Sequence, residues 1–219
     1  MSAESDDRLR VLSLAGVTGY GEGHRLQLET VDAVKRGEVP DTLILLEHAP
    51  VITLGKNADV TGILAPRELL FRMGVEVHRI ERGGQATYHC PGQLVGYPIM
   101  DLHRLKLGAA RYVHLIEQVL IEICAHYHIP ARRIEGLTGI FTGNGAKIGA
   151  LGIRISRGIS YHGFALNISP DLSGYRLIVP CGLTDTPVAR MADYTAVCPE
   201  MDDVKEVAVA SFRNVFQLS

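Results

Sequence analysis

Residues 82–98 read RGGQATYHCPGQLVGYP, and this stretch decides how the rest of the chain is interpreted. It holds four glycines and two prolines together with an arginine, a histidine, a cysteine, two glutamines and two tyrosines. Glycine and proline allow tight turns and a close approach of the backbone to another molecule. The stretch therefore suits either a rigid loop whose N–H groups and imidazole face a ligand, or a plain turn between two strands.

Length and composition favour a single soluble domain. The chain has 219 residues, of which 47% are hydrophobic, and shows no linker-like break, so we expect a flexible tail at residues 1–8 and one domain over residues 9–219. A net charge of -2 argues against a nucleic-acid or membrane-surface protein. No apolar run has membrane-spanning length, and the first residues, MSAESDDRLR, are acidic and polar, so we expect a cytoplasmic protein.

Hydrophobic periodicity predicts an α+β fold with mixed or antiparallel sheets flanked by helices. Strands are expected at residues 10–15, 42–47, 51–54, 75–80 and 93–100, and within 136–143, 146–155 and 158–168. Helices are expected at residues 20–36, 66–73, 109–126 and 203–216. Asp203 and Glu206 have the spacing of a capping box at the start of the last helix. Cys124 falls on the apolar face of the third helix and is expected in the core.

A glycine-rich run at residues 142–152, TGNGAKIGALG, surrounds Lys147. It does not open with the Gly-Lys-Ser/Thr of a phosphate-binding loop, so an NTPase is disfavoured. A lysine among small and apolar residues can serve as a base or hold an anion, because burial disfavours the ammonium form. The alternative is a lysine at the end of a strand that reaches into solvent.

The four cysteines are far apart and contain no Cys-x-x-Cys, so neither a zinc site nor a disulfide framework is indicated. Cys181 lies between Pro180 and Gly182, where its sulfur is either an exposed nucleophile on a constrained turn or a buried apolar filler. No spacing of His, Cys and carboxylate residues indicates a metal site, and no carboxylate pair suits glycoside hydrolysis. The residues alone thus lead to a possible Cys/Lys acyl-transfer enzyme.

Small residues flank the imidazole of His162 in the segment YHGFALN, residues 161–167. This pattern permits close approach of a substrate to the backbone. Packing within a hairpin explains it nearly as well.

Four segments together resemble the lipoyl(octanoyl) transferase family: EHAPVITLG, RGGQATYHCPGQLVGYP, AKIGALGIRISRGISYHGFALNI and IVPCGL. The resemblance covers roughly residues 20–167 and continues to residue 183. One residue departs from the family pattern, because Cys90 stands where the family usually has glycine after the histidine. A side chain there is expected to affect the geometry near His89.

The resemblance implies the fold of the biotin and lipoate protein ligases, with Cys181 as the nucleophile and Lys147 as its partner. It places the substrate contacts on the first motif and on two short strand segments. These are Arg82, Gly83, Gly84, Gln85, Ala86, Thr87, Tyr88 and His89, then Ala150, Leu151 and Gly152, then Gly163, Phe164 and Ala165.

The activity implied by the resemblance is transfer of an octanoyl group from octanoyl-acyl carrier protein to a lysine of a lipoyl domain, through an octanoyl-Cys intermediate. The acceptors would be lipoyl domains of 2-oxoacid dehydrogenase E2 subunits and the glycine cleavage H protein. Neither ATP nor a metal is expected, and we expect a monomer. The rivals are an ATP-dependent lipoate or biotin ligase of the same fold and a non-catalytic acyl-binding module.

Such protein partners are typically acidic. Residues 130–192 carry seven Lys/Arg against three Asp/Glu, which fits either a docking face for them or scattered solvated charges.

Overall fold

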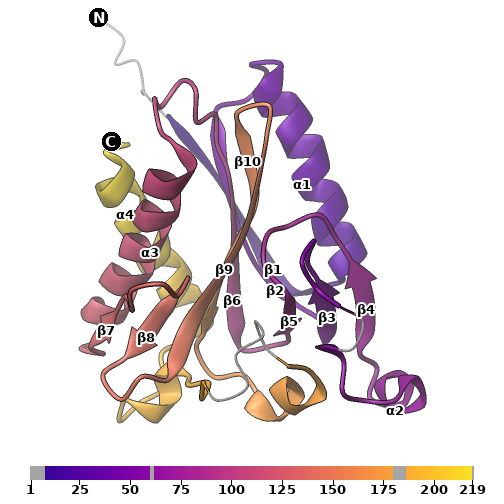
Figure 1. Cartoon of the computed structure of the whole chain (residues 1–219). Coiled ribbons are helices and arrows are strands. Elements are labelled where there is room, and N and C mark those ends of the chain that lie inside the picture. Colours follow the sequence, from indigo (N-terminus) through magenta and orange to yellow (C-terminus); the bar gives the residue numbers. More distant parts are fainter. Residues whose placement is uncertain (1–7, 60–61, 180–185, 219) are drawn as a thin grey trace, which may run out of the picture.

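A seven-stranded sheet forms the centre of the molecule (Figure 1). The computed structural model describes residues 8–59, 62–179 and 186–218. In spatial order the strands are β1 (Leu9–Thr18), β2 (Asp41–His48), β6 (Gln93–Ile99), β10 (Ile159–Asn167), β9 (Lys147–Ser156), β8 (Ile140–Thr142) and β7 (Ala131–Arg132). β1 and β2 are parallel and the other neighbours are antiparallel, so the sheet is mixed.

A second, three-stranded sheet lies beside the first. It carries part of residues 82–98, which we call the glycine-rich motif. Its order is β4 (Glu76–Arg79), β3 (Val51–Leu54) and β5 (Ala86–His89), and the short helix α2 (Arg67–Arg72) precedes β4. β5 is the one strand of this sheet that periodicity did not predict. Its four residues lie inside the stretch that we interpreted as a loop, where the neighbouring glycines hide the alternation of side chains.

Helices cover both faces of the large sheet. α3 (Ala109–His126) and α4 (Met201–Phe216) lie together on one face, and α1 (Tyr20–Lys35) covers the other (Figure 1). Ile116, Leu120 and Ile123 on α3 are fully buried, as their spacing of three and four residues predicts. Cys124 joins them in the core, which confirms its assignment.

The predicted capping box at Asp203 is wrong. α4 begins at Met201, two residues earlier than expected, and its N-cap is Glu200, which makes no side-chain capping hydrogen bond. Asp202 and Asp203 lie instead within the first turn, where their negative charges interact favourably with the positive end of the helix dipole. Two short 3₁₀ helices, Leu172–Leu177 and Met191–Asp193, lie in the segment between β10 and α4.

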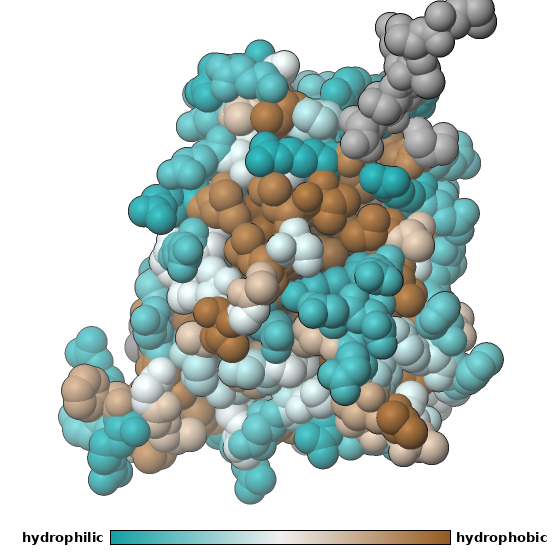
Figure 2. Space-filling model, turned by 180° about the vertical axis from the view of Figure 1, so that it is seen from behind, coloured by the Kyte–Doolittle hydropathy of each residue, from teal (hydrophilic) through white to brown (hydrophobic). Residues whose placement is uncertain are grey.

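The expected class, α+β with mixed sheets flanked by helices, is confirmed. Seen from behind, the surface carries a broad hydrophobic area framed by polar side chains (Figure 2). Among the described residues, no helix is both long and apolar enough to cross a membrane.

Candidate functional site

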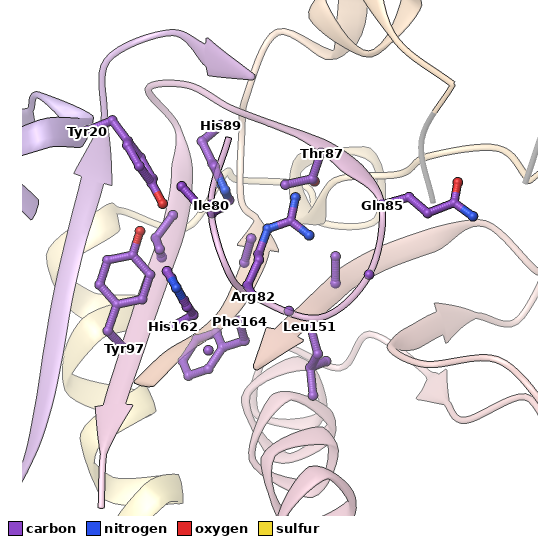
Figure 3. A pocket seen from close by; sticks show the side chains of 16 residues that line it. Tyr20, Ile80, Arg82, Gln85, Thr87, His89, Tyr97, Leu151, His162 and Phe164 are labelled. Carbon is purple, nitrogen blue, oxygen red and sulfur yellow. The ribbon is translucent and has the colours of Figure 1, made fainter. Parts of the chain in front are cut away.

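A pocket lies where the glycine-rich motif approaches the middle of β9 and β10 (Figure 3). It encloses about 510 Å³, a volume that includes space open to solvent. Most of the residues predicted to contact substrate line it. They are Arg82, Gly84, Gln85, Thr87, His89, Ala150, Leu151, Gly152, Gly163, Phe164 and Ala165. Three segments distant in sequence are thus brought together around one cavity.

Three residues predicted to contact substrate do not line this pocket. Ala86 and Tyr88 alternate with Thr87 and His89 along β5, so they face the other side of the small sheet and pack in its hydrophobic cluster. The backbone N–H of Gly83 donates to the carbonyl of Ile153 on β9 at 3.0 Å. Gly83 therefore ties the motif to the large sheet, next to the pocket.

Cys90, the departure from the family pattern, also lies in the hydrophobic cluster of the small sheet and is not among the lining residues. Burial raises the pKa of its thiol to about 11, although a hydrogen bond with Tyr88 acts in the opposite direction. Cys90 is therefore a packed thiol, and its side chain does not narrow the pocket.

Sequence reasoning missed the wall that α1 and β6 contribute. Tyr20, Ile80, Val95, Tyr97 and His162 line the pocket as well. The hydroxyl groups of Tyr20 and Tyr97 point toward one another (Figure 3). His162 carried a signal in the sequence as an imidazole beside small residues, and Val95 and Tyr97 lie within the stretch at residues 82–98, whereas Tyr20 and Ile80 carried none.

Small residues keep the floor of the pocket flat. Phe164 on β10 pairs with Gly96 on β6, and a Cβ added to Gly96 would lie 2.1 Å from the Phe164 ring. A Cβ on Gly163 would lie 2.2 Å from the carbonyl oxygen of Gly96. Glycine at position 96 therefore leaves room for the Phe164 ring, and glycine at position 163 allows the close approach of the β10 backbone to the β6 backbone.

Arg82 stiffens the motif from within, and its side chain is almost fully buried. Its guanidinium donates to the Thr53 carbonyl at 2.7 Å, to the Thr53 hydroxyl, and to the carbonyl of Gly83 at 2.9 Å. These bonds join the loop to β3. The arginine therefore holds the position of the loop that covers the pocket.

Buried histidines in and beside the pocket are neutral at pH 7. Burial lowers the pKa of His48 and of His162 to about 4, and that of His89 to about 3. His89 Nδ1 donates to the Gln93 side-chain oxygen at 2.6 Å, because that oxygen can only accept. His89 and His162 therefore give the pocket wall polar groups without charge, which suits an uncharged ligand.

Lys147, the predicted partner of the nucleophile, lines a second cavity that adjoins the first. Thr87, Ala150 and Ala165 line both cavities. Lys147 is the first residue of β9, and its Nζ lies 5.5 Å from the centre of the Phe141 ring. Cys181 itself lies outside the described residues.

The backbone of Lys147 is paired with the chain that follows residues 180–185. Its N–H donates to the carbonyl of Pro187 at 2.7 Å, and its carbonyl accepts from the N–H of Ala189 at 3.0 Å. On the other flank, the N–H of Val179 donates to the carbonyl of Gly62 at 2.8 Å. The chain is thus fixed on both sides of the segment that contains Cys181.

Glu117 on α3 supports the lysine indirectly. Its carboxylate accepts from the Gly139 N–H at 2.9 Å and from Arg133 Nε at 3.1 Å. The backbone of Gly139 lies close to Lys147, since a Cβ added there would be 2.8 Å from Lys147 Cε. A buried carboxylate thereby fixes the surface against which the lysine side chain packs.

Comparison with known proteins gives consistent relatives. The profile of the lipoyl protein ligase A/B catalytic domain matches residues 20–213. An octanoyltransferase of Koribacter versatilis is 47% identical, over 95% of this chain and 84% of the relative. An octanoyltransferase of Chloroflexus aurantiacus is 44% identical, over 93% of this chain and 92% of the relative.

Among solved structures, a bipartite lipoate protein ligase from Thermoplasma acidophilum superposes with a TM-score of 0.74 at 18% identity. The match covers 96% of this chain and 84% of the other. The fold expected from the resemblance is therefore confirmed.

Proposed function

The chain belongs to the lipoyl protein ligase A/B catalytic-domain family and is an acyltransferase that transfers octanoyl groups in protein lipoylation. On this premise we propose that the donor is octanoyl-acyl carrier protein, that the acceptor is the lysine of a lipoyl domain, and that the octanoyl group passes through a thioester on Cys181. Lipoyl domains of 2-oxoacid dehydrogenase E2 subunits and the glycine cleavage H protein are the proposed acceptors.

The observation that carries the proposal is the adjoining pair of cavities. One is lined by apolar and neutral polar side chains together with Arg82, whose guanidinium is bonded to backbone carbonyls, the other contains Lys147, and Thr87, Ala150 and Ala165 line both. An acyl chain in the first cavity directs its carbonyl end past these residues toward the lysine. This arrangement suits chemistry at the carboxyl end of a saturated chain.

In the first step, the Cys181 thiolate attacks the carbonyl carbon of the donor thioester. A new C–S bond forms, the bond to the carrier sulfur breaks, and the carrier thiolate leaves and takes up a proton. The Lys147 ammonium stabilises the attacking thiolate, as a nearby cation does in other reactive cysteines. One thioester replaces another, so this step is close to isoenergetic.

In the second step, the neutral amine of the acceptor lysine attacks the octanoyl-Cys carbonyl. An amide bond forms, the C–S bond breaks, and Cys181 regains its thiol with a proton from the attacking amine, with Lys147 managing that proton. An amide is more stable than a thioester, so this step drives the reaction. The donor is already activated, and no ATP is required.

Chain-length selection follows from how far the pocket extends. Each buried CH₂ contributes about 0.8 kcal/mol, so the seven carbons beyond the carbonyl of an octanoyl group contribute roughly 5 to 6 kcal/mol before ordering costs. Loss of one carbon is a modest penalty on this scale. Selection for eight carbons therefore rests on where Tyr20, Tyr97 and His162 close the pocket.

The test is intact-mass analysis after mixing the protein with octanoyl-acyl carrier protein in the absence of ATP. Wild type should gain the mass of one octanoyl group, and Cys181→Ala should not. Cys198→Ala removes an exposed cysteine away from the site and should behave as wild type. Strict dependence on ATP, or labelling that survives in Cys181→Ala, would refute the mechanism and favour the ligase alternative.

A further inference from the structure

Three side chains from distant parts of the sequence converge beside the acyl pocket. His24 comes from α1, Glu81 from the loop after β4, and His162 from β10. His24 Nε2 and His162 Nε2 lie 3.6 and 3.8 Å from Glu81 Oε1, and the three donor atoms are within 4.8 Å of one another. The two imidazole rings are nearly parallel, with centroids 5.6 Å apart.

The two nitrogens that face Glu81 are buried, and among the described residues their contacts with the Glu81 carboxylate, 3.6 and 3.8 Å, are longer than a hydrogen bond. His162 is only 2% exposed, whereas the side chains of His24 and Glu81 are 25% and 38% exposed, so the cluster is buried at His162 and reached by solvent at Glu81. Buried polar atoms in native proteins are nearly always satisfied, and each exception calls for an explanation such as an ion. Two such atoms aimed at the same carboxylate indicate one shared partner.

The distances between the donor atoms are longer than those of hydrogen bonds. An N–H···O bond places its heavy atoms at about 2.7–3.2 Å, which is shorter than either contact. Donors at roughly 2.0–2.2 Å from a tetrahedral zinc ion are about 3.3–3.6 Å apart. The separations of 3.6 and 3.8 Å are therefore close to those of ligands around a common ion.

The surroundings hold these donors in place. His162 has a φ of 54°, a left-handed conformation that is costly for a residue within a strand, and its N–H donates to Gln27 Oε1 at 2.9 Å. The guanidinium of the nearby Arg82 is engaged by Thr53 and the Gly83 carbonyl.

We propose that His24, Glu81 and His162 bind one divalent transition-metal ion of the zinc class at the wall of the acyl pocket. Two imidazoles and one carboxylate are ligands typical of zinc, whereas magnesium and calcium prefer oxygen donors. Three protein ligands leave a fourth position for water or a ligand oxygen. Because His162 also lines the pocket, the ion links α1 and the glycine-rich motif to the acyl site.

This site differs from the expectation of no metal, and its invisibility in the sequence has a simple reason. The donors lie at positions 24, 81 and 162, so no short spacing pattern exists. Only the packing of α1 against β10, and the approach of the Glu81 loop, bring them together.

The test is titration of metal-free full-length protein with Co²⁺, followed by absorbance, and with Zn²⁺ in competition with a chromophoric chelator. Wild type should bind one equivalent of Zn²⁺ and show the intense visible bands of four-coordinate Co²⁺. His24→Ala and Glu81→Gln change partly exposed side chains and should leave the far-UV circular dichroism unchanged. Each should weaken Zn²⁺ binding at least about 10-fold, because losing a metal ligand costs no less than losing a residue that only hydrogen-bonds to a ligand.

His78→Ala is the matched control. His78 pairs with Glu76 at 2.7 Å on β4 but lacks a second imidazole, so its removal should leave Zn²⁺ affinity unchanged. Zn²⁺ should also raise the melting temperature of wild type and of His78→Ala, and not that of His24→Ala. Absence of stoichiometric binding in wild type would overturn the proposal. Binding that persists unchanged in His24→Ala and Glu81→Gln, as at a cysteine site elsewhere, would overturn it as well.

Discussion

His48 provides a measurable link between the buried histidines and stability in acid. Its side chain is fully buried, and Nδ1 lies 3.0 Å from the carbonyl of Thr18 while Nε2 lies 2.6 Å from the Tyr97 hydroxyl. A carbonyl can only accept, so Nδ1 carries the proton and the Tyr97 hydroxyl donates to Nε2. The rings of Tyr20 and His89 pack around it. A second proton on Nε2 requires the Tyr97 hydroxyl to accept this bond instead of donating it, and to direct its own proton elsewhere.

The pKa of His48 is lowered from 6.5 to about 4, chiefly by burial, against the hydrogen bond to Thr18 and with a further lowering from His78. Since the folded pKa lies below the unfolded one, the unfolded chain takes up the proton first as the pH falls. Stability is therefore full above pH 6.5 and is lost between about 6.5 and 4. Linkage converts this shift into a loss of about 2 kcal/mol between pH 7 and pH 5 from His48 alone.

The assay is urea unfolding followed by circular dichroism at half-unit steps from pH 7 to pH 5. Wild type should lose about 2 kcal/mol more over this range than His48→Gln, whatever the stability of that variant at pH 7. His126→Gln, at an exposed position on α3, is the control and should follow wild type. If the curves of wild type and His48→Gln run parallel, the imidazole is not held neutral by the fold and the reasoning fails.

Three further predictions concern the acyl site. Lys147→Ala should slow the appearance of the octanoyl adduct, measured by mass analysis of acid-quenched time points, with little loss of donor binding in a titration. Unchanged turnover would remove Lys147 from the mechanism. Gly96→Ala forces a Cβ against the Phe164 ring, so it should lower stability by about 1–3 kcal/mol and weaken octanoyl donor binding, whereas Gly143→Ala, which meets nothing within 4 Å, should do neither. Glu117→Ala leaves the Gly139 N–H and Arg133 without their carboxylate, so the free energy of unfolding in urea should fall by roughly 1–3 kcal/mol and acylation should be slower. Glu135→Ala, at an exposed position, is the control, and equal acylation rates in the two variants would contradict the supporting role.

The sequence predicts most of the elements because their side-chain periodicity is strong. The spacing of Ile116, Leu120 and Ile123 determines α3 to the residue, and the run at residues 51–54 is β3 as predicted. β5 was missed because its four residues are too few to show a clear alternation of side chains, and the glycines and proline on either side of them favour a turn. The start of α4 was missed because Asp203 resembles a capping residue but serves as a first-turn acid.

The site was predictable where it lies in continuous motifs. The segments at residues 82–89, 150–152 and 163–165 do meet in one pocket, as the resemblance implied, apart from Gly83, Ala86 and Tyr88. The contributions of Tyr20 and Tyr97 depend on how α1 packs on the sheet and on which face of β6 is turned inward. Such information resides in tertiary packing, and no local pattern in one sequence carries it.

The three residues that separate the two cavities, Thr87, Ala150 and Ala165, have a consequence for redesign of the enzyme. A partition shared by the acyl pocket and the lysine cavity cannot be reshaped for one purpose alone. Under the proposed mechanism, a bulkier side chain there to favour shorter acyl chains would displace the reacting carbonyl from Lys147, so we expect kcat and KM to change together. Variants that accept other chain lengths at full speed are better sought at the opposite end, around Tyr20 and Tyr97.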